Sequence, residues 1–235
     1  MALTDELNSE VQDILNSSWN IRDARVVPSS SDVALADGGA RFDGTVLYSD
    51  LAQSSELATD FHARTAAKVL KSFVRCCVRI INDQGGTVTS FDGDRVMGIF
   101  VGDRKNSSAA IAALKINQVV SNIIRPQAQT AFASVRDSGF KITHATGIDS
   151  SSILAVRAGQ RGDNDIVWVG RAPNFAAKLC SIRENNFATY ISNDVFDRIS
   201  DDAKLGGSEK KLMWESRTFK WMDKDWSIHR SSWIW

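Results

Sequence analysis

The sequence predicts an α+β sandwich, a mixed or antiparallel sheet flanked by helices, and three observations support this fold class. Segments with a helical period alternate with short apolar runs that are rich in β-branched and aromatic residues. Several of these runs are joined by short turn signals, which indicates hairpins rather than a purely parallel sheet. The chain has 235 residues, 43% of them hydrophobic and 24% charged, which is typical of a globular protein with a substantial core.

We expect an N-terminal helix and linker over residues 1–40 and one main domain over residues 41–235. Residues 5–18 have an amphipathic pattern, and the serine-, aspartate- and glycine-rich stretch 27–40 is typical of a linker. The expected elements of the main domain, in chain order, are a strand at 44–51, a helix at 56–83, strands at 87–91 and 95–101, a helix at 107–124, strands at 139–147 and 152–158, a loop at 159–166, a helix at 173–183, a strand at 188–192, a short helix at 193–199 and a strand-like end at 212–235.

Glycine and proline positions predict where the two long helices end. Gly85 and Gly86 follow the first, and Pro126 is expected to stop the second. The last segment holds five tryptophans, and we interpret them as core or subunit-contact residues rather than a platform for nucleic acid. They are Trp214, Trp221, Trp226, Trp233 and Trp235.

Charge and cysteine content narrow the function classes. The 28 Lys and Arg balance the 28 Asp and Glu, and a net charge of zero argues against binding nucleic acid through a basic face. The three cysteines and three histidines show no disulfide or zinc spacing, which favours a reduced, cytoplasmic protein. The first residues are polar and acidic, unlike a signal peptide, and no apolar run approaches the ~20 residues that a membrane span needs. We therefore expect neither nucleic acid nor membrane as a partner.

Two aspartates stand at the ends of strands that are expected to be neighbours. In "VTSFDGDRVMGIF" (88–100), Asp92 and Gly93 form a hairpin-turn signal, and Asp94 is left where the return strand begins. Asp50 ends the strand at 44–51, just before a turn and a helix for which the following serines are better caps. Two such carboxylates can hold divalent cations that share a triphosphate, and the helix N-terminus after Asp50 is suited to phosphate.

Here the chain resembles the catalytic domain of class III nucleotidyl cyclases. Asp50 after "VLYS" and Asp94 in "FDGD" match the two metal aspartates of that family. The segment "VWVGRAPNFAAKL" (167–179) resembles the family's loop and helix that carry a transition-state asparagine. Asn174 takes that position, and Lys178 stands where an arginine is usual, one helical turn further. The resemblance implies a ferredoxin-like sandwich of the class III cyclase type.

The resemblance also implies a reaction in which the ribose 3′-hydroxyl attacks the α-phosphorus and pyrophosphate leaves. Two divalent ions, Mn²⁺ or Mg²⁺, would be held by Asp50, Asp94 and the backbone carbonyl of Leu51. Asn174 would orient the ribose, and Lys178 would meet the charge that grows on the α-phosphate. In the family these groups come from opposite subunits, so a homodimer with two shared active sites is implied.

Base recognition departs from the family's purine patterns. Ser90 stands where a lysine or glutamate is usual, and Val167 where an aspartate or cysteine is usual. Tyr48 lies two residues before Asp50 and shares its face of a strand, so it is either a reader of the base or a core tyrosine.

Three basic residues are further substrate-binding candidates. Arg157 and Arg161 are candidates for a base or phosphate contact. Lys220 loosely matches a lysine that meets the terminal phosphates, and it is equally well read as a solvated strand lysine.

The likeness to class III cyclases extends from about residue 41 to the C-terminus, and within it the stretch "GQRGDNDIVWVGRAPNFAAKL" (159–179) resembles the pyrimidine cyclases of bacterial Pycsar antiphage systems. That resemblance implies a pyrimidine nucleotide as substrate and a cyclic product that activates a downstream effector. We expect UTP and cyclic UMP, with CTP and cyclic CMP as the alternative. Three alternatives stay open: an adenylyl cyclase with an unusual base pocket, a catalytically silent dimer that binds nucleotide, and an RNA-binding module, which the neutral charge disfavours.

Overall fold

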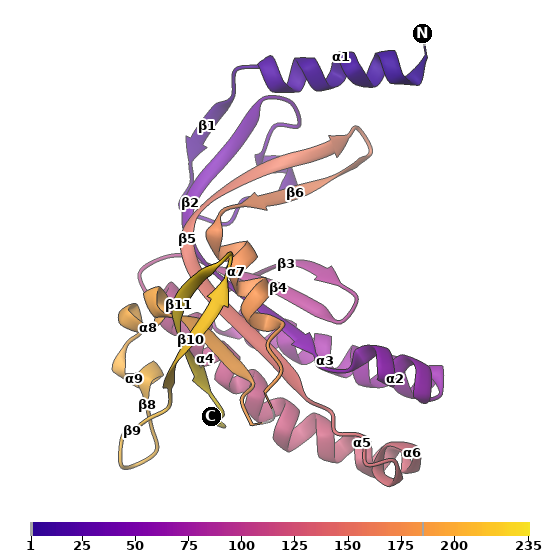
Figure 1. The fold of residues 1–235 in the computed structure, drawn as a ribbon, viewed down its shortest axis with the longest axis vertical. Helices are drawn as coiled ribbons and strands as arrows, with labels where there is room; N and C mark the ends of the chain where they lie inside the picture. The colour runs from indigo at the N-terminus through magenta and orange to yellow at the C-terminus, as the bar shows by residue number, and fades with distance from the viewer. Residues whose placement is uncertain (1, 185) are drawn as a thin grey trace. The chain divides into compact units, whose positions relative to one another are not determined.

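The computed structural model describes residues 2–184 and 186–235, which fold into two compact units (Figure 1). The smaller unit comprises the chain up to Asp43 together with Ser152–Gly170, and the larger unit comprises Gly44–Ser151 and Arg171–Trp235. The domain boundary expected near residue 41 lies inside the strand β2 (Gly38–Leu51), and the division into domains stays a prediction.

The smaller unit contains a helix, the 3₁₀ turn η1 (Ser30–Asp32) and two strand pairings. Helix α1 (Leu3–Asn16) agrees with the amphipathic pattern, and none of its residues is buried. Strand β1 (Asn20–Asp23) pairs in parallel with the start of β2, so the stretch expected as a linker ends in a strand. The end of β5 (His144–Gln160) forms a hairpin with β6 (Asp163–Val169). The loop expected at 159–166 is therefore wrong, since a two-residue turn with Gly162 at a φ of 100° is enough to reverse the chain.

The larger unit is built on an open, mixed sheet. Its strands run in the order β10–β11–β7–β5–β2–β4–β3, and β7 pairs in parallel with β5 whereas β3–β4, β4–β2, β7–β11 and β11–β10 pair in antiparallel fashion. Their bounds are β3 (Thr87–Asp92), β4 (Arg95–Phe100), β7 (Thr189–Ser192), β10 (Glu215–Trp221) and β11 (Lys224–Ser231). The expected mixed sheet flanked by helices is confirmed.

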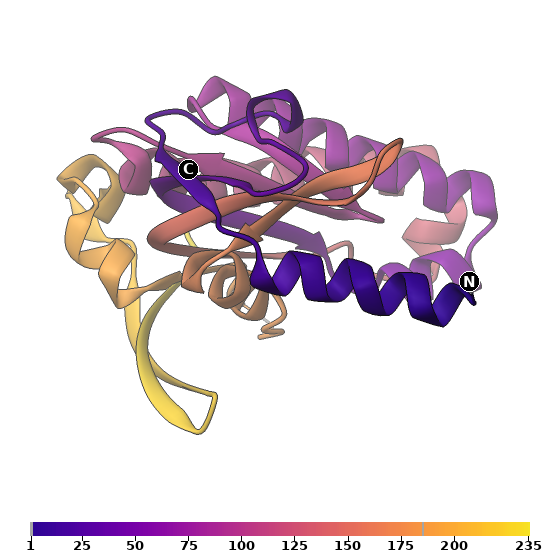
Figure 2. The ribbon, with the colours of Figure 1, turned by 90° about the horizontal axis from the view of Figure 1, so that it is seen from above.

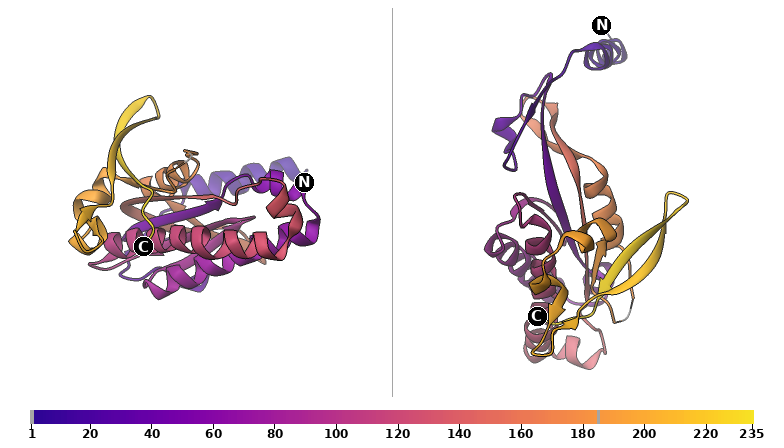
Figure 3. Two further views of the ribbon diagram at one scale, coloured as in Figure 1. Left: turned by 90° about the horizontal axis from the view of Figure 1, so that it is seen from below. Right: turned by 90° about the vertical axis from the view of Figure 1, so that its left-hand side faces the viewer.

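Helices cover both faces of this sheet, and each face has its own apolar core. The helices are α2 (Ser54–Asp60), α3 (Ala63–Asp83), α4 (Lys105–Val119), the π-helical turn η2 (Val120–Ile124), α5 (Arg125–Ala131), α6 (Ala133–Asp137), α7 (Arg171–Cys180), α8 (Asn193–Arg198) and α9 (Asp201–Lys204). Helices α3 and α4 lie side by side and bury Phe73, Ile81 and Leu114 against one face (Figure 2). Helix α7 and the β10–β11 hairpin enclose Phe175 on the opposite side (Figure 3). None of the described helices is long and apolar enough to cross a membrane.

The long helices differ from expectation in two places. The helix expected at 56–83 is interrupted at Phe61 and His62, and the His62 ring nitrogen Nδ1 accepts a hydrogen bond from the Arg64 N–H at 3.2 Å, which caps α3. The helix expected to stop at Pro126 continues to Ala131. The wider π-helical turn η2 precedes Pro126. Proline has no N–H to donate to the regular series of helical hydrogen bonds, and the wider turn accommodates this missing bond so that the helix can continue.

The aromatic C-terminal segment packs mainly within the chain. The Phe175 ring lies 4.8 Å from the Trp221 ring and 4.9 Å from the Trp226 ring, measured between centroids. Trp214 is buried, and its indole N–H donates to the Ala203 carbonyl at 2.8 Å. Trp214 is confirmed as a core residue, Trp221, Trp226 and Trp233 are partly buried against the two apolar clusters, and Trp235 is exposed. The strands expected at 139–147 and 152–158 are one continuous strand, β5, which begins at His144.

Candidate active site

The structure brings Asp50 and Asp94 together at the ends of β2 and the β3–β4 hairpin. The backbone N–H of Leu51 donates to Asp94 Oδ2 at 3.1 Å, which ties the hairpin tip to the end of β2. Burial raises the pKa of the Asp94 carboxyl, and the negative charge of Asp50 raises it further. Two carboxylates that repel each other in this way favour a cation between them.

The hairpin tip differs in detail from the expected Asp92–Gly93 turn. Asp92 pairs with Arg95, so the two turn residues are Gly93 and Asp94. Gly93 has a φ of 60°, a conformation that suits glycine at the first position of a tight hairpin turn. Asp94 therefore belongs to the turn itself, which fixes its carboxylate beside Leu51.

Two arginines that no sequence pattern singles out contact Asp50. Arg183 Nη2 donates to Asp50 Oδ2 at 2.8 Å, and Arg95 Nη2 lies 3.6 Å from the same oxygen. The Asp50 side chain is only 12% exposed, so these cations neutralise a largely buried charge. Arg183 lies 133 positions away in the chain, and no local pattern predicts a contact over that separation.

The residues present fit a divalent cation that also binds phosphate. The described part of the chain has no cluster of three or more His, Cys, Asp or Glu side chains that could hold a metal alone. Two carboxylates and the Leu51 carbonyl are oxygen donors, and a hard cation with so few protein ligands completes its shell with water and phosphate oxygens. The hydrogen bond of 3.1 Å from the Leu51 N–H to Asp94 Oδ2, which brings these oxygen donors to one place, is the observation that supports this fit.

Tyr48 and Ser90 lie in one row across three strands of the larger unit. Tyr48 on β2 pairs with Met97 on β4, and Met97 pairs with Ser90 on β3. Directly paired residues of antiparallel strands share a face, and Asp50 follows Tyr48 by two residues, so it shares that face as well. Leu47 and Val96, on the alternate positions, belong to the core under α3 and α4.

This row therefore faces away from the α3–α4 core, on the same face as the carboxylates. Tyr48 is half-buried, and burial raises the pKa of its phenol, so the hydroxyl remains a neutral hydrogen-bonding group.

Helix α7 presents Asn174 and Lys178 on its exposed face. Both side chains are exposed, whereas Phe175, Ala176 and Leu179 on the other side are buried. Among the described residues no carboxylate forms an ion pair with Lys178. Both side chains are therefore accessible to solvent on one face of α7.

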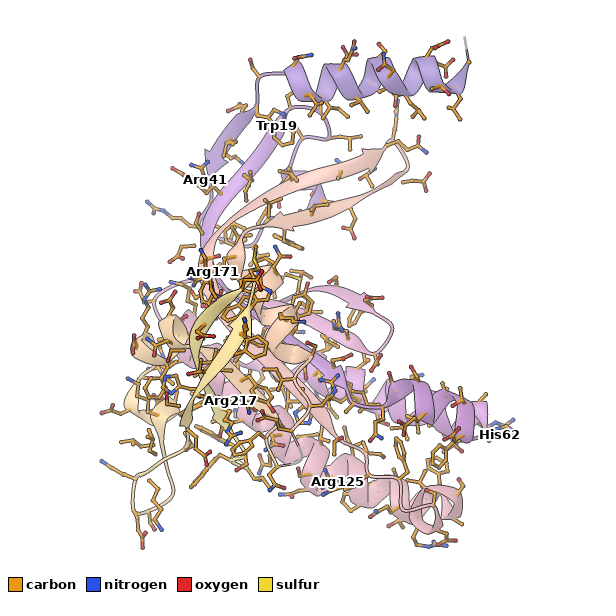
Figure 4. The ribbon with its side chains drawn as sticks, viewed as in Figure 1. Trp19, Arg41, His62, Arg125, Arg171 and Arg217 are labelled. Atoms are coloured by element: carbon orange, nitrogen blue, oxygen red, sulfur yellow. The ribbon has the colours of Figure 1, made fainter. Side chains whose placement is uncertain are left out.

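The start of α7 is fixed by an arginine clamp that sequence reasoning missed. Arg171 donates to both oxygens of Asp149, from Nε at 2.9 Å and from Nη2 at 3.1 Å (Figure 4 labels Arg171). Asp149 is fully buried, and the same guanidinium also contacts Asp194 on α8. On β5, a Cβ at Gly147 would collide with the backbone of α7 at Ala176, so the strand and the helix are in close contact.

The remaining candidates lie on separate elements. Val167 is on β6 and 47% exposed, and Arg157 is on β5, where its Nε donates to Asn164 Oδ1 at 2.6 Å. Both belong to the smaller unit, as does Arg161 in the β5–β6 turn. Lys220 is exposed on β10, opposite Asp225 on β11. Their roles in substrate binding stay predictions.

Comparison with solved structures defines the class of fold. The guanylyl cyclase Cya2 aligns with a TM-score of 0.68 and 16% identity over 83% of this chain and 94% of that one. The adenylyl cyclase CyaB from P. aeruginosa aligns with a TM-score of 0.60 and 21% identity over 82% and 95% of the two chains. The chain therefore has the fold of class III nucleotidyl cyclases. No protein-family model matches the sequence.

Full-length relatives define the family. A uridylate cyclase of Rhodovulum sp. (strain MB263) is 42% identical over 99% of this chain and 97% of its own length. A uridylate cyclase of Xanthomonas perforans is 41% identical over 100% and 99%, and one of Burkholderia cepacia is 38% identical over 100% and 99%. The chain belongs to the uridylate cyclase family, and the resemblance found in the sequence is confirmed.

Proposed function

We propose that this protein converts UTP to cyclic UMP and pyrophosphate. The observation that carries the proposal is the identity of 38–42% over essentially the whole chain to three proteins named uridylate cyclase. The paired carboxylates of Asp50 and Asp94 support it, because they supply the acidic site that cyclisation of a nucleoside triphosphate needs.

In the proposed reaction the ribose 3′-oxygen forms a bond to the α-phosphorus, and the bond from that phosphorus to the β-phosphate oxygen breaks. The 3′-hydroxyl proton passes to solvent, and pyrophosphate leaves. Asp50, Asp94 and the Leu51 carbonyl would hold two divalent ions, Mg²⁺ or Mn²⁺, which lower the pKa of that hydroxyl and neutralise the phosphates. Asn174 orients the ribose, and Lys178 stabilises charge on the α-phosphate oxygens.

The proposed enzyme is a homodimer with two shared sites. Asn174 and Lys178 lie exposed on α7, and a second copy would bring its own carboxylates to them. The neutral Tyr48 hydroxyl and Ser90, in one row with Asp50, are the proposed contacts to the pyrimidine. Either hydroxyl can donate or accept, so CTP is the second candidate substrate.

We place the reaction in the cytoplasm, with cyclic UMP acting as a signal to an effector in antiphage defence. Cysteine usage without a disulfide framework supports the compartment. The antiphage role is carried over from the Pycsar-like segment at 159–179.

Product analysis tests the proposal. The purified protein is incubated with each of the four ribonucleoside triphosphates and Mn²⁺, and the products are identified by mass spectrometry. Cyclic UMP as the main product is expected, and cyclic CMP would change only the choice of pyrimidine. Cyclic AMP or cyclic GMP as the main product would contradict a pyrimidine cyclase. No product from any nucleotide, with nucleotide still bound, would indicate the silent nucleotide-binding dimer.

A further inference from the structure

Helix α3 presents a row of basic side chains on the face that is turned away from the sheet. Its five bases follow the spacing i, i+4, i+7, i+11 and i+15, which places them on one side of a helix. All five are exposed, whereas Phe73 and Ile81 on the opposite side are buried. We call this set the basic row, and its members are Arg64, Lys68, Lys71, Arg75 and Arg79.

No described carboxylate neutralises the basic row by an ion pair. Asp83 is the one carboxylate of α3, and its Oδ2 pairs instead with Lys115 Nζ of α4 at 3.5 Å. Within residues 2–184 and 186–235 no ion pair includes a member of the basic row. Like charges one helical turn apart repel each other, so this face favours an acidic partner.

Helix α1 has the opposite charge. It carries four carboxylates and no basic residue, and Glu6, Glu10 and Asp13 form an acidic row at the spacing i, i+4 and i+7. Among the described residues no carboxylate of α1 takes part in an ion pair. The acidic row spans about 10 Å along its helix axis, and the stretch from Lys71 to Arg79 spans about 12 Å, so the two rows match in length.

An exposed apolar stripe lies beside the acidic row of α1. Leu7, Val11 and Ile14 share one side of the helix and are 49–59% exposed. An isolated helix of 14 residues is marginal in water, because most helix stability in proteins comes from packing of the apolar face. The stripe therefore needs a partner surface. Helix α3 offers one, since Val74 and Val78 lie beside the basic row and are only partly buried.

The two units of the chain carry opposite net charge. The smaller unit has ten acidic and five basic residues, which gives a net charge of −5. Because the whole chain is neutral, the larger unit has a net charge of +5. The smaller unit of one copy is thus complementary in charge to the larger unit of another copy, and such complementarity steers association.

We propose that α1 of one copy docks on the basic row of α3 in a second copy of this chain. The acidic row then faces Lys71, Arg75 and Arg79, and the apolar stripe covers Val74 and Val78. A second copy is the occupant because the chain itself provides a helix of matching charge, apolar pattern and length. The contact joins two different surfaces, so two copies can make it twice about a two-fold axis.

This docking surface is separate from the α7 face, to which the proposed function assigns the shared active sites. The inference therefore goes beyond the proposed function and holds whether or not the protein is a cyclase.

Charge reversal tests the docking by sedimentation equilibrium of the full chain, without nucleotide or divalent cation. The acid-reversed variant carries Glu6→Lys, Glu10→Lys and Asp13→Lys, and the base-reversed variant carries Lys71→Glu, Arg75→Glu and Arg79→Glu. Each variant alone should self-associate about tenfold more weakly than the wild type, because like charges then face each other. An equimolar mixture should recover the wild-type affinity to within about threefold, because every α1 then finds an α3 of opposite charge in the other variant.

The matched control reverses three exposed basic residues outside α3. Arg198→Glu, Lys210→Glu and Lys211→Glu together change the net charge by the same amount as the base-reversed variant. This control should self-associate within about twofold of the wild type. Far-UV circular dichroism and thermal unfolding show whether each variant is folded before its affinity is compared.

Salt provides a second measurement that needs no substitution. Raising the ionic strength from about 0.1 M to 1 M shortens the Debye length from about 10 Å to about 3 Å. Self-association of the wild type should then weaken by about tenfold, whereas that of either reversed variant should not weaken.

Four outcomes would overturn the docking. A monomeric wild type, or equal self-association of the wild type and both reversed variants, would mean that the two rows do not meet. A mixture that associates no more strongly than its components would place the contact within one chain. Binding of a short DNA duplex at physiological salt by the wild type, but not by the base-reversed variant, would make the basic row a nucleic-acid site instead. Cyclase activity enters none of these measurements, so the proposed function can fail without affecting them.

Discussion

The Arg171–Asp149 clamp gives the sharpest prediction about how the fold positions α7. Replacing Arg171 with methionine keeps the length of the side chain and leaves Asp149 as a fully buried carboxylate without its cation. Removing one partner of a buried pair costs about 3–5 kcal/mol, and because the Arg171 side chain is 32% exposed we expect about 3 kcal/mol. Urea unfolding followed by circular dichroism, with an unchanged m value, measures this loss.

The loss should depend on pH. Burial already raises the pKa of the Asp149 carboxyl, and loss of Arg171 raises that pKa further. A carboxyl whose pKa is higher in the folded state than in the unfolded state destabilises the protein only when the pH is above the pKa of the unfolded state. The full loss of stability is reached when the pH exceeds the pKa of the folded state. The difference between Arg171→Met and the wild type should therefore be larger at pH 8 than at pH 5.

Two variants complete the test. Arg171→Met combined with Asp149→Asn buries no charge, so it should recover more than half of the lost stability. Arg136→Met makes the same substitution in an exposed ion pair and should cost less than about 0.5 kcal/mol. A loss below about 1 kcal/mol in Arg171→Met, or a double variant less stable than the single, would refute the view that this pair anchors α7.

Three further predictions concern the carboxylates, the dimer and the buried histidine. Asp94→Asn should abolish cyclase activity and leave the stability in urea unfolding equal or higher, because it removes the repulsion from Asp50. The control Asp92→Asn should keep most of the activity. An active Asp94→Asn variant would rule out Asp94 as a metal ligand. The variants Asp50→Asn and Asn174→Ala should each be inactive. A mixture of the two should regain about a quarter of wild-type activity, since half of the dimers would have one complete site of two. No recovery after proven subunit exchange would mean that each site lies within one chain. His144 has a pKa lowered to about 3, so the unfolded chain binds the proton first and stability should fall as pH drops below 6.5, by about 3 kcal/mol at pH 4.5. In His144→Gln the free energy of unfolding, measured in urea, should fall less steeply between pH 6.5 and 4.5. The same pH dependence in both proteins would contradict the attribution of this loss to His144.

Some features of this protein were determined by sequence alone, because they depend on neighbours in the chain. Asp50 and Asp94 could be found as carboxylates at strand ends, since alternation and the glycine at position 93 are local signals. Asn174 and Lys178 are four residues apart on one helix, and that spacing alone puts them on one face. The mixed sheet flanked by helices followed from the same kind of periodicity.

Other features were decided only by the tertiary structure. The 159–166 stretch forms a hairpin and the helix before Pro126 continues, because pairing with β5 and a π turn override local propensity. The contact of Arg183 with Asp50 joins residues 133 positions apart. Ion pairs over such separations carry no periodic signal, since a guanidinium reaches whichever carboxylate the packed backbone brings to it.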